Sequence, residues 1–182
     1  MSFMMLVMIF MLLPRAQVAA KRINEVLATE PAIHDGTRTE GAEGHAGEVV
    51  FKNVSFRYPD AEDSVIENIS FTAKRGETIA FIGATGCGKS TVVNLIPRFY
   101  DASEGEVLVD GVNVKDYTQQ ALRDKIGYVS QKAILFAGSV RDNINFGDNG
   151  RGPISGEMVK QAIATAQATE FIEQMEDGYD GR

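Results

Sequence analysis

The sequence predicts an α/β fold built around one glycine-rich loop, with part of a transmembrane helix ahead of it. Three observations support this prediction. Residues 83–91 match the phosphate-binding pattern G-x-x-x-x-G-K-[ST] at every fixed position. The loop lies between an apolar strand, residues 78–82, and a helical stretch, residues 90–96, which is the context that the pattern requires. The chain also begins with an almost wholly apolar run, residues 1–13.

This apolar run is too short to span a bilayer by itself, which takes about 20 residues. A signal peptide is one interpretation, but no Lys or Arg precedes the run. Arg15, Lys21 and Arg22 follow it instead, which by the positive-inside rule places that flank in the cytoplasm. We therefore expect residues 1–13 to be the cytoplasmic half of a transmembrane helix, continued by a polar helix that Pro31 ends.

The segment after this helix is expected to lead into a soluble domain. Residues 31–47 are rich in Gly, Thr, Glu and Asp and have the composition of a linker. The domain begins near Glu48, with expected strands at residues 50–57 and 69–73 and a turn at residues 75–77. The strand, loop and helix of the phosphate-binding pattern follow directly.

Beyond the loop, residues 105–109 form an expected strand that runs into an Asp-Gly turn. A second short strand is expected at residues 126–130. Ser139, with an aspartate three residues later, has the spacing of a capping box and predicts a short helix. A longer helix is expected from Ser155, because apolar residues there recur at helical spacing, and it is expected to run on to Met175.

The composition narrows the function classes. The net charge of −7 argues against a nucleic-acid partner, because such partners select basic surfaces. The single cysteine, Cys87, excludes an internal disulfide and fits a reducing compartment. Cys87 lies inside the glycine-rich loop, where a reactive thiol and a small residue that simply fits are both open interpretations.

The loop residues fit the recognition of a nucleoside triphosphate. Glycines let the backbone N–H groups point at phosphate oxygens, beside the positive end of the following helix. Lys89 supplies a positive charge for the β- and γ-phosphates, and the Ser90 hydroxyl is a hard oxygen donor for Mg²⁺. Tyr58, at the end of the first expected strand, can stack on adenine, and Gln131 can join Mg²⁺ or orient water. Each of these last two residues, taken alone, is also typical of an ordinary strand end or a solvated side chain.

Together these features resemble the ATP-binding domain of an ABC transporter of the exporter type. Tyr58 resembles the adenine-stacking aromatic of the A-loop, residues 83–91 resemble the Walker A motif, and Gln131 resembles the Q-loop glutamine. Residues 136–144 resemble the stretch that meets the membrane domain, and the apolar start resembles the last membrane helix of a half-transporter. The resemblance implies a P-loop NTPase core with an antiparallel β subdomain, truncated, and preceded by a partial transmembrane helix.

The resemblance also implies roles for individual residues. It assigns Lys89 and Gln131 to catalysis, and Ser90 and Gln131 to Mg²⁺. It assigns ATP binding to Tyr58, Gly83, Thr85, Gly86, Cys87, Gly88, Lys89, Ser90, Thr91 and Gln131.

Several family motifs are absent from the 182 residues: the signature Leu-Ser-Gly-Gly-Gln, the Walker B strand that ends in Asp-Glu, and the switch histidine. Residues 108–110 form an apolar run that ends in Asp, but a Gly follows, so a structural turn is the better interpretation. We therefore expect an internal fragment of three parts. Residues 1–30 are the end of the last transmembrane helix and its cytoplasmic extension, residues 31–47 the linker, and residues 48–182 the N-terminal part of the ATP-binding domain.

For the parent protein, the resemblance implies ATP hydrolysis coupled to export. The expected partners are a second ABC subunit, in a homodimer or a heterodimer, and a transmembrane domain. The expected location is the plasma membrane, with the ATP-binding domain on the cytoplasmic side. The 182 residues alone are expected to bind Mg-ATP weakly without turnover.

Two alternatives remain open from the sequence. One is a non-catalytic nucleotide-binding fragment, because the binding motifs are present and the hydrolysis motifs are not. The other is a P-loop small-molecule kinase, for which Arg123 and Arg141 are the only candidates for lid arginines.

Overall fold

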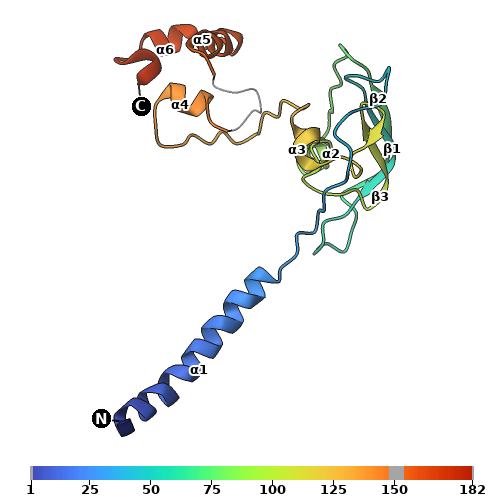
Figure 1. The fold of residues 1–182 in the computed structure, drawn as a ribbon. Helices are drawn as coiled ribbons and strands as arrows, with labels where there is room; N and C mark the ends of the chain where they lie inside the picture. Colours follow the sequence, from blue (N-terminus) through green and yellow to red (C-terminus); the bar gives the residue numbers. More distant parts are fainter. Residues whose placement is uncertain (1, 148–153, 182) are drawn as a thin grey trace.

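The computed structural model describes residues 2–147 and 154–181. Figure 1 shows a long N-terminal helix that stands apart from a unit built on a β-sheet, and a separate group of short helices near the C-terminus. Most residues of the sheet unit lie between residues 35 and 126, and this unit carries the glycine-rich loop. The antiparallel sheet together with the helices confirms the expected fold class, an α/β fold with an antiparallel β subdomain.

The N-terminal helix α1 (Ser2–Leu27) is one continuous element with Pro14 inside it. Within residues 3–27, an 18-residue window has a mean hydropathy of 1.8 and none of it is buried inside the protein, so the helix is long and apolar enough to cross a membrane. The helix ends three residues before the expected stop, which lay just ahead of Pro31. The Thr29 hydroxyl donates a hydrogen bond to the Glu25 carbonyl (2.9 Å) and satisfies one free acceptor at this end.

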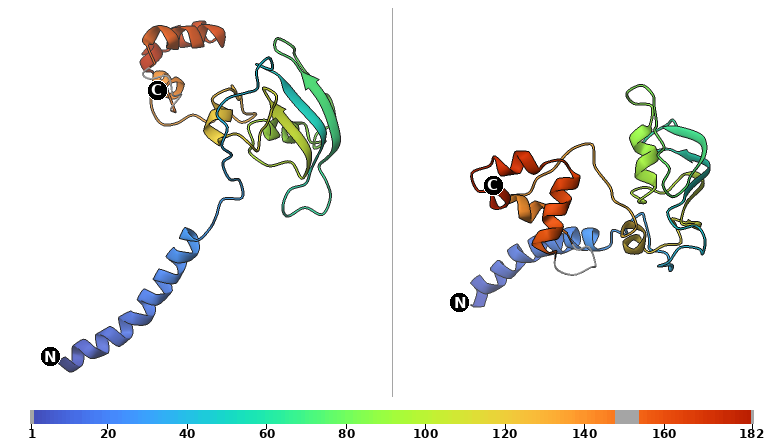
Figure 2. Two further views of the ribbon diagram at one scale, coloured as in Figure 1. Left: turned by 45° about the vertical axis from the view of Figure 1, so that its right-hand side comes forward. Right: turned by 90° about the horizontal axis from the view of Figure 1, so that it is seen from above.

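The sheet has four antiparallel strands in the order β2-β1-β3-β4. Its strands are β1 (Val49–Phe56), β2 (Ile66–Ala73), β3 (Glu104–Val109) and β4 (Val112–Asn113). The three longer strands confirm the strands expected around residues 50–57, 69–73 and 105–109. Figure 2 shows β1, β2 and β3 running side by side as one twisted layer.

The apolar core lies between this sheet and the helix α2 (Lys89–Leu95) that follows the loop. Phe51 and Val54 of β1 are 2% and 0% exposed, and they share one cluster with Val92 and Leu95 of α2. Burial of such side chains contributes about 1.5–3 kcal/mol each. The same burial fixes α2 against the sheet, and with it the loop at the start of α2.

The β3–β4 hairpin turns through Asp110 and Gly111, whose φ angles of 50° and 73° are those of a two-residue hairpin turn. The Asp110 carboxylate accepts hydrogen bonds from the Gly47 N–H (2.7 Å) and from Lys125 Nζ (3.1 Å). This confirms that residues 108–110 end in a structural turn. Close by, the buried Tyr117 hydroxyl donates to the Val109 carbonyl (3.1 Å), and burial raises the pKa of Tyr117.

The expected linker, residues 31–47, is fully described by the structure and contains no helix or strand. From Gly36 onward it is nevertheless attached to the sheet unit. The Gly36 N–H donates to the Tyr117 carbonyl (2.9 Å), and Arg38 forms a β-bridge with Tyr117. A Cβ at Gly36 would lie 2.1 Å from a neighbouring backbone oxygen, so only glycine allows this approach. The boundaries of the linker stay a prediction, but the segment packs on the sheet unit through these contacts.

Two expected strands, residues 78–82 and 126–130, do not form. No strand among the described residues pairs with either segment, and backbone N–H and C=O groups need such a partner to make a strand. Some of their apolar side chains therefore stay in solvent, with Ile82 96% and Val129 94% exposed. The sequence patterns were those of buried strands, but the neighbours that would bury them are not in the described chain.

We expect this exposed apolar surface to drive self-association of the 182-residue chain. In a detergent that covers α1, light scattering should detect large oligomers of the chain. The double substitution Ile82→Lys with Val129→Lys should shift the chain toward a monomer. Phe171→Lys adds a charge on an exposed residue of a different region and serves as the control. A monodisperse unmodified chain would contradict the prediction.

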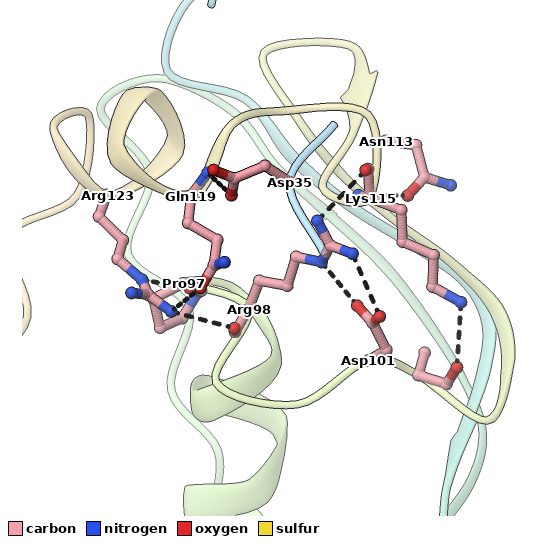
Figure 3. Close-up of polar contacts among 9 residues, drawn as sticks. Asp35, Pro97, Arg98, Asp101, Asn113, Lys115, Gln119 and Arg123 are labelled. Atoms are coloured by element: carbon pink, nitrogen blue, oxygen red, sulfur yellow. Dashed lines mark hydrogen bonds and ion pairs between the residues drawn. The ribbon is translucent and has the colours of Figure 1, made fainter. Parts of the chain in front are cut away.

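The turn after α2 is fixed by a buried arginine (Figure 3). Arg98 is 4% exposed and holds the Asp101 carboxylate with two hydrogen bonds, from Nε at 2.7 Å and from Nη2 at 3.2 Å. Its Nη1 donates to the Lys115 carbonyl at 3.2 Å. Arg98 has a φ of 55°, a strained value for a residue with a side chain. The network thus stabilises an unusual backbone conformation directly after α2.

A second set of contacts continues from this turn to the linker (Figure 3). Arg123, in the short helix α3 (Gln119–Arg123), donates to the carbonyls of Pro97 (3.2 Å) and Arg98 (3.3 Å). The Gln119 side chain accepts from Arg123 (3.0 Å), and the Gln119 N–H donates to Asp35 (2.9 Å). This backbone hydrogen bond is the main reason why the pKa of Asp35 is lowered. The sequence interpretation had not predicted α3.

The C-terminal helices form a small cluster of their own around Val159, Ile163 and Ile172. The helix α4 (Val140–Ile144) begins with the expected capping box, in which Ser139 and Asp142 bond each other's backbone. The helix α5 (Gly156–Thr165) starts after Ser155 as expected.

The expectation that this helix runs to Met175 is wrong. Gln167 has a φ of 56°, which breaks it, and a separate helix α6 (Thr169–Glu173) and a 3-10 turn, η1 (Gly178–Asp180), follow.

Candidate nucleotide-binding site

The glycine-rich loop is an open turn in front of α2. Gly86 and Gly88 have φ angles of 86° and 87°, which side chains disfavour, and the Cys87 N–H donates to the Ala84 carbonyl (3.3 Å). A Cβ at Gly86 would meet nothing within 4 Å, so the space beside the turn is free. The first N–H groups of α2, which starts at Lys89, have no partner within the helix. These features suit the binding of an anion.

Lys89 places a positive charge at this turn. Its Nζ donates to the carbonyls of Gly83 (2.9 Å) and Ala84 (2.7 Å) and lies 3.5 Å from Cys87 Sγ. The ammonium group is therefore held at the loop by the loop's own backbone. Its contact with the β- and γ-phosphates stays a prediction.

Tyr58 lies beside the same helix, although it is 33 residues away in sequence. Its hydroxyl is 3.2 Å from Oγ1 of Thr91, which is buried on α2 two residues after Lys89. The Tyr58 ring is half-buried and packs against Phe56 at 4.8 Å between ring centroids. The structure thus brings together the aromatic residue and the loop that the sequence had predicted for one nucleotide site.

The comparison with protein families gives one match. The ABC transporter family matches residues 66–180, which is more than half of the chain. The chain belongs to the ABC transporter family. The match includes the glycine-rich loop, Gln131 and the C-terminal helices.

Individual relatives agree with this assignment. The ABC transporter ATP-binding protein YwjA of Bacillus subtilis is 41% identical over 167 residues, which cover 92% of this chain. Multidrug resistance protein 1 of Entamoeba histolytica is 46% identical over 169 residues, covering 91% of the chain. Among solved structures, a bacterial Atm1-family ABC exporter with ATP bound is similar, with a TM-score of 0.84, 31% identity and 97% of the chain covered.

The chain spans only part of each of these proteins. It corresponds to 28% of the Bacillus subtilis protein, 13% of the Entamoeba histolytica protein and 30% of the Atm1-family exporter chain. The activity of a whole transporter is therefore proposed for the parent protein below, on the basis of these partial matches.

The other predicted site residues of this ABC transporter chain have fewer contacts with the phosphate loop and with one another. Gln131 is exposed and has no hydrogen bond to the phosphate loop within the described residues. The segment just before it is tied to the far end of α2, where the Tyr128 hydroxyl donates to Asn94 (2.9 Å). Its role at the metal stays a prediction. Thr85 and Cys87 are exposed at the loop, and their contacts to a nucleotide also stay predictions.

The metal part of the prediction rests on Ser90. Its side chain is exposed at the start of α2, next to Lys89, and a hydroxyl is a donor that Mg²⁺ accepts. Within the described residues, no group of three or more His, Cys, Asp or Glu side chains could hold a metal ion. The donor set thus fits a metal that arrives with phosphate oxygens rather than one held by protein ligands alone.

One aromatic residue near the site was missed by the sequence interpretation. Tyr100 lies in the turn after α2, with its ring centroid 5.2 Å from that of Tyr58. No local pattern marks this contact, because it depends on how the turn folds back toward β1.

Proposed function

We propose that this chain is the ATP-binding part of an ABC exporter, which couples ATP binding and hydrolysis to export of a substrate across a membrane. The observation that carries the proposal is the contact of Tyr58 with Thr91 at 3.2 Å. It puts a stacking ring beside the loop that holds Lys89, so that one ligand with an aromatic base and a triphosphate matches both ends of the site.

Each residue has a proposed task. The loop N–H groups and Lys89 bind the phosphates, and Tyr58 stacks on adenine. Ser90 and Gln131 hold Mg²⁺, which supplies positive charge for the transferred phosphoryl group when it is bound. Lys89 Nζ bonds two loop carbonyls, and we propose that phosphate oxygens replace these contacts when ATP binds.

For the whole transporter, we propose a dimer of two such subunits, identical or different, each attached to a transmembrane domain. Support comes from α1, which is long and apolar enough to cross a membrane, and from the exporter and multidrug resistance relatives. We propose that the ATP-binding domain lies on the cytoplasmic side of the plasma membrane, and the positive charges that follow the apolar run support this side. The acidic net charge of −7 argues against nucleic acid as a partner.

Titration calorimetry of the 182-residue chain with Mg-ATP tests the binding proposal. We expect weak binding that Lys89→Ala reduces by about 10- to 100-fold, because a hydrogen bond to a charged group contributes about 1.5–3 kcal/mol. Lys74→Ala removes an exposed lysine outside the loop and is the matched control, expected to leave the affinity unchanged. Equal affinity in the unmodified chain and the Lys89→Ala variant would refute the proposal.

A further inference from the structure

We propose that Thr91 and Tyr100 are positioning residues for the nucleotide base, because together they fix the ring of Tyr58 before the nucleotide binds. This inference rests on the proposed function, since it requires that ATP binds at the loop. It concerns how the base end of the site is built, and it assigns to Thr91 and Tyr100 a role in base recognition that acts through Tyr58, separate from any contact of Thr91 with the phosphates.

The first contact is the hydrogen bond between Tyr58 and Thr91. Thr91 is 6% exposed, and its Oγ1 lies 3.2 Å from the Tyr58 hydroxyl. A threonine inside a helix commonly bonds the carbonyl one turn earlier, but here its oxygen faces a side chain of another element. The bond fixes the outer end of the Tyr58 ring to α2. It therefore links the base end of the site to the helix that begins at the phosphate loop.

The ring of Tyr58 also contacts two other aromatic rings. Tyr58 meets Tyr100 at 5.2 Å with an angle of 87° between the rings, and Phe56 at 4.8 Å with an angle of 83°. Phe56 and Tyr100 also contact each other at 5.4 Å, so the three rings form one cluster. Both contacts of Tyr58 are nearly perpendicular, so neither neighbour lies flat on its ring. The proposal requires the base to stack on a face of Tyr58 that the edges of these two rings leave open.

Holding the Tyr58 ring in place before binding raises the affinity for the base, because the ring then loses less conformational freedom when the base binds. A Tyr58 ring that is free to rotate would still attract a base, but its ordering would then oppose binding. The proposal predicts that the benefit applies to the base alone. The affinity for a ligand that has the phosphates without the base should not depend on how Thr91 and Tyr100 hold Tyr58.

The test compares Mg-ATP with magnesium tripolyphosphate, which lacks the base and the sugar, by calorimetry on the full chain in detergent. In the unmodified chain we expect the ratio of the two Kd values to favour ATP by about 5- to 100-fold, from base stacking. Tyr58→Phe keeps the ring and removes the bond to Thr91, and it should lower this ratio about three- to tenfold. Thr91→Val should do the same, and the double variant should lower it no further. Tyr100→Leu should also lower the ratio.

Conservative variants and a neighbouring residue provide the controls. Thr91→Ser keeps a hydroxyl and Tyr100→Phe keeps the ring, so both should restore the ratio. Phe99→Leu removes an aromatic ring of nearly the same exposure, 39% against 38% for Tyr100, that packs on Tyr128 instead of Tyr58. It should leave the ratio unchanged.

Three results would overturn the inference. The ratio in the unmodified chain could be close to one, the variants could leave it unchanged, or they could weaken both ligands equally, which would indicate a general structural role. If the unmodified chain bound neither ligand, the proposed function itself would fail.

Discussion

Replacing Arg98 with alanine is expected to destabilise the sheet unit by about 2–4 kcal/mol. Arg98 is 4% exposed and makes three hydrogen bonds, two to the Asp101 carboxylate and one to the Lys115 carbonyl. Removing one partner of a buried ion pair costs about 3–5 kcal/mol, because the other charge is left uncompensated. The expected loss is somewhat smaller here, since the Asp101 side chain is 30% exposed and water can solvate part of its charge.

The position of Arg98 makes this loss important for the site. The residue lies directly after α2, and its carbonyl accepts a hydrogen bond from Arg123. Loss of its guanidinium removes the contacts that hold the turn in its left-handed conformation. We therefore expect the variant to loosen α2 and, with it, the phosphate loop at the other end of this short helix.

Hydrogen exchange measured by mass spectrometry, together with urea unfolding followed by circular dichroism, will test this expectation. Arg98→Ala should raise exchange across β1 and α2 and shift the unfolding midpoint to lower urea. Lys52→Ala breaks an ion pair with Glu106 whose side chains are 55% and 54% exposed, so it should change stability by less than about 1 kcal/mol. If Arg98→Ala remained within this range as well, the proposed role of the buried network would be wrong.

The sequence allowed accurate prediction where the signal was local. The strand β3 and its Asp-Gly turn are marked by residues next to one another, and the capping box of α4 spans only four residues. The phosphate loop is also a continuous pattern, and in the structure it forms a turn ahead of α2 with Lys89 bonded to the loop backbone. Such features need no knowledge of the rest of the fold.

Predictions that needed a distant partner failed or required the family resemblance. Residues 78–82 have the apolar composition of a strand, yet no described strand pairs with them and Ile82 stays exposed. The contact of Tyr58 with Thr91 joins positions 33 apart and was not predicted; the sequence predicted only that Tyr58 and the phosphate loop serve the same nucleotide. The docking of Asp35 onto α3 was not foreseen, because it depends on a hydrogen bond between residues 84 apart.

The second large effect is expected in turnover. The 182-residue chain should bind Mg-ATP yet hydrolyse it several powers of ten more slowly than a typical enzyme. The sequence lacks the Asp-Glu of a Walker B strand, and removal of one group that stabilises a transition state costs about 10²–10³ in rate. From a typical rate of about 10 s⁻¹, the loss of two such groups leaves about 10⁻³ s⁻¹ or less.

The described residues offer no substitute for these groups at the loop. Asp110 ends an apolar run as a Walker B aspartate would, but its carboxylate is bound by Gly47 and Lys125 in the hairpin turn. His45 lies upstream in the expected linker, where its Nδ1 is 2.6 Å from a Glu48 carboxylate oxygen. Both side chains thus have structural partners in the hairpin region, away from Lys89.

Phosphate release from saturating Mg-ATP, measured beside the Lys89→Ala variant, distinguishes true turnover from a contaminating ATPase. We expect equal background rates in both samples, while calorimetry on the same preparations shows tighter Mg-ATP binding in the unmodified chain than in the variant. A rate of about 1–100 s⁻¹, the range typical of kinases, that disappears in Lys89→Ala would contradict the prediction. Such a result would mean that side chains within these 182 residues already polarise the attacking water, and Gln131 would then be the first residue to substitute.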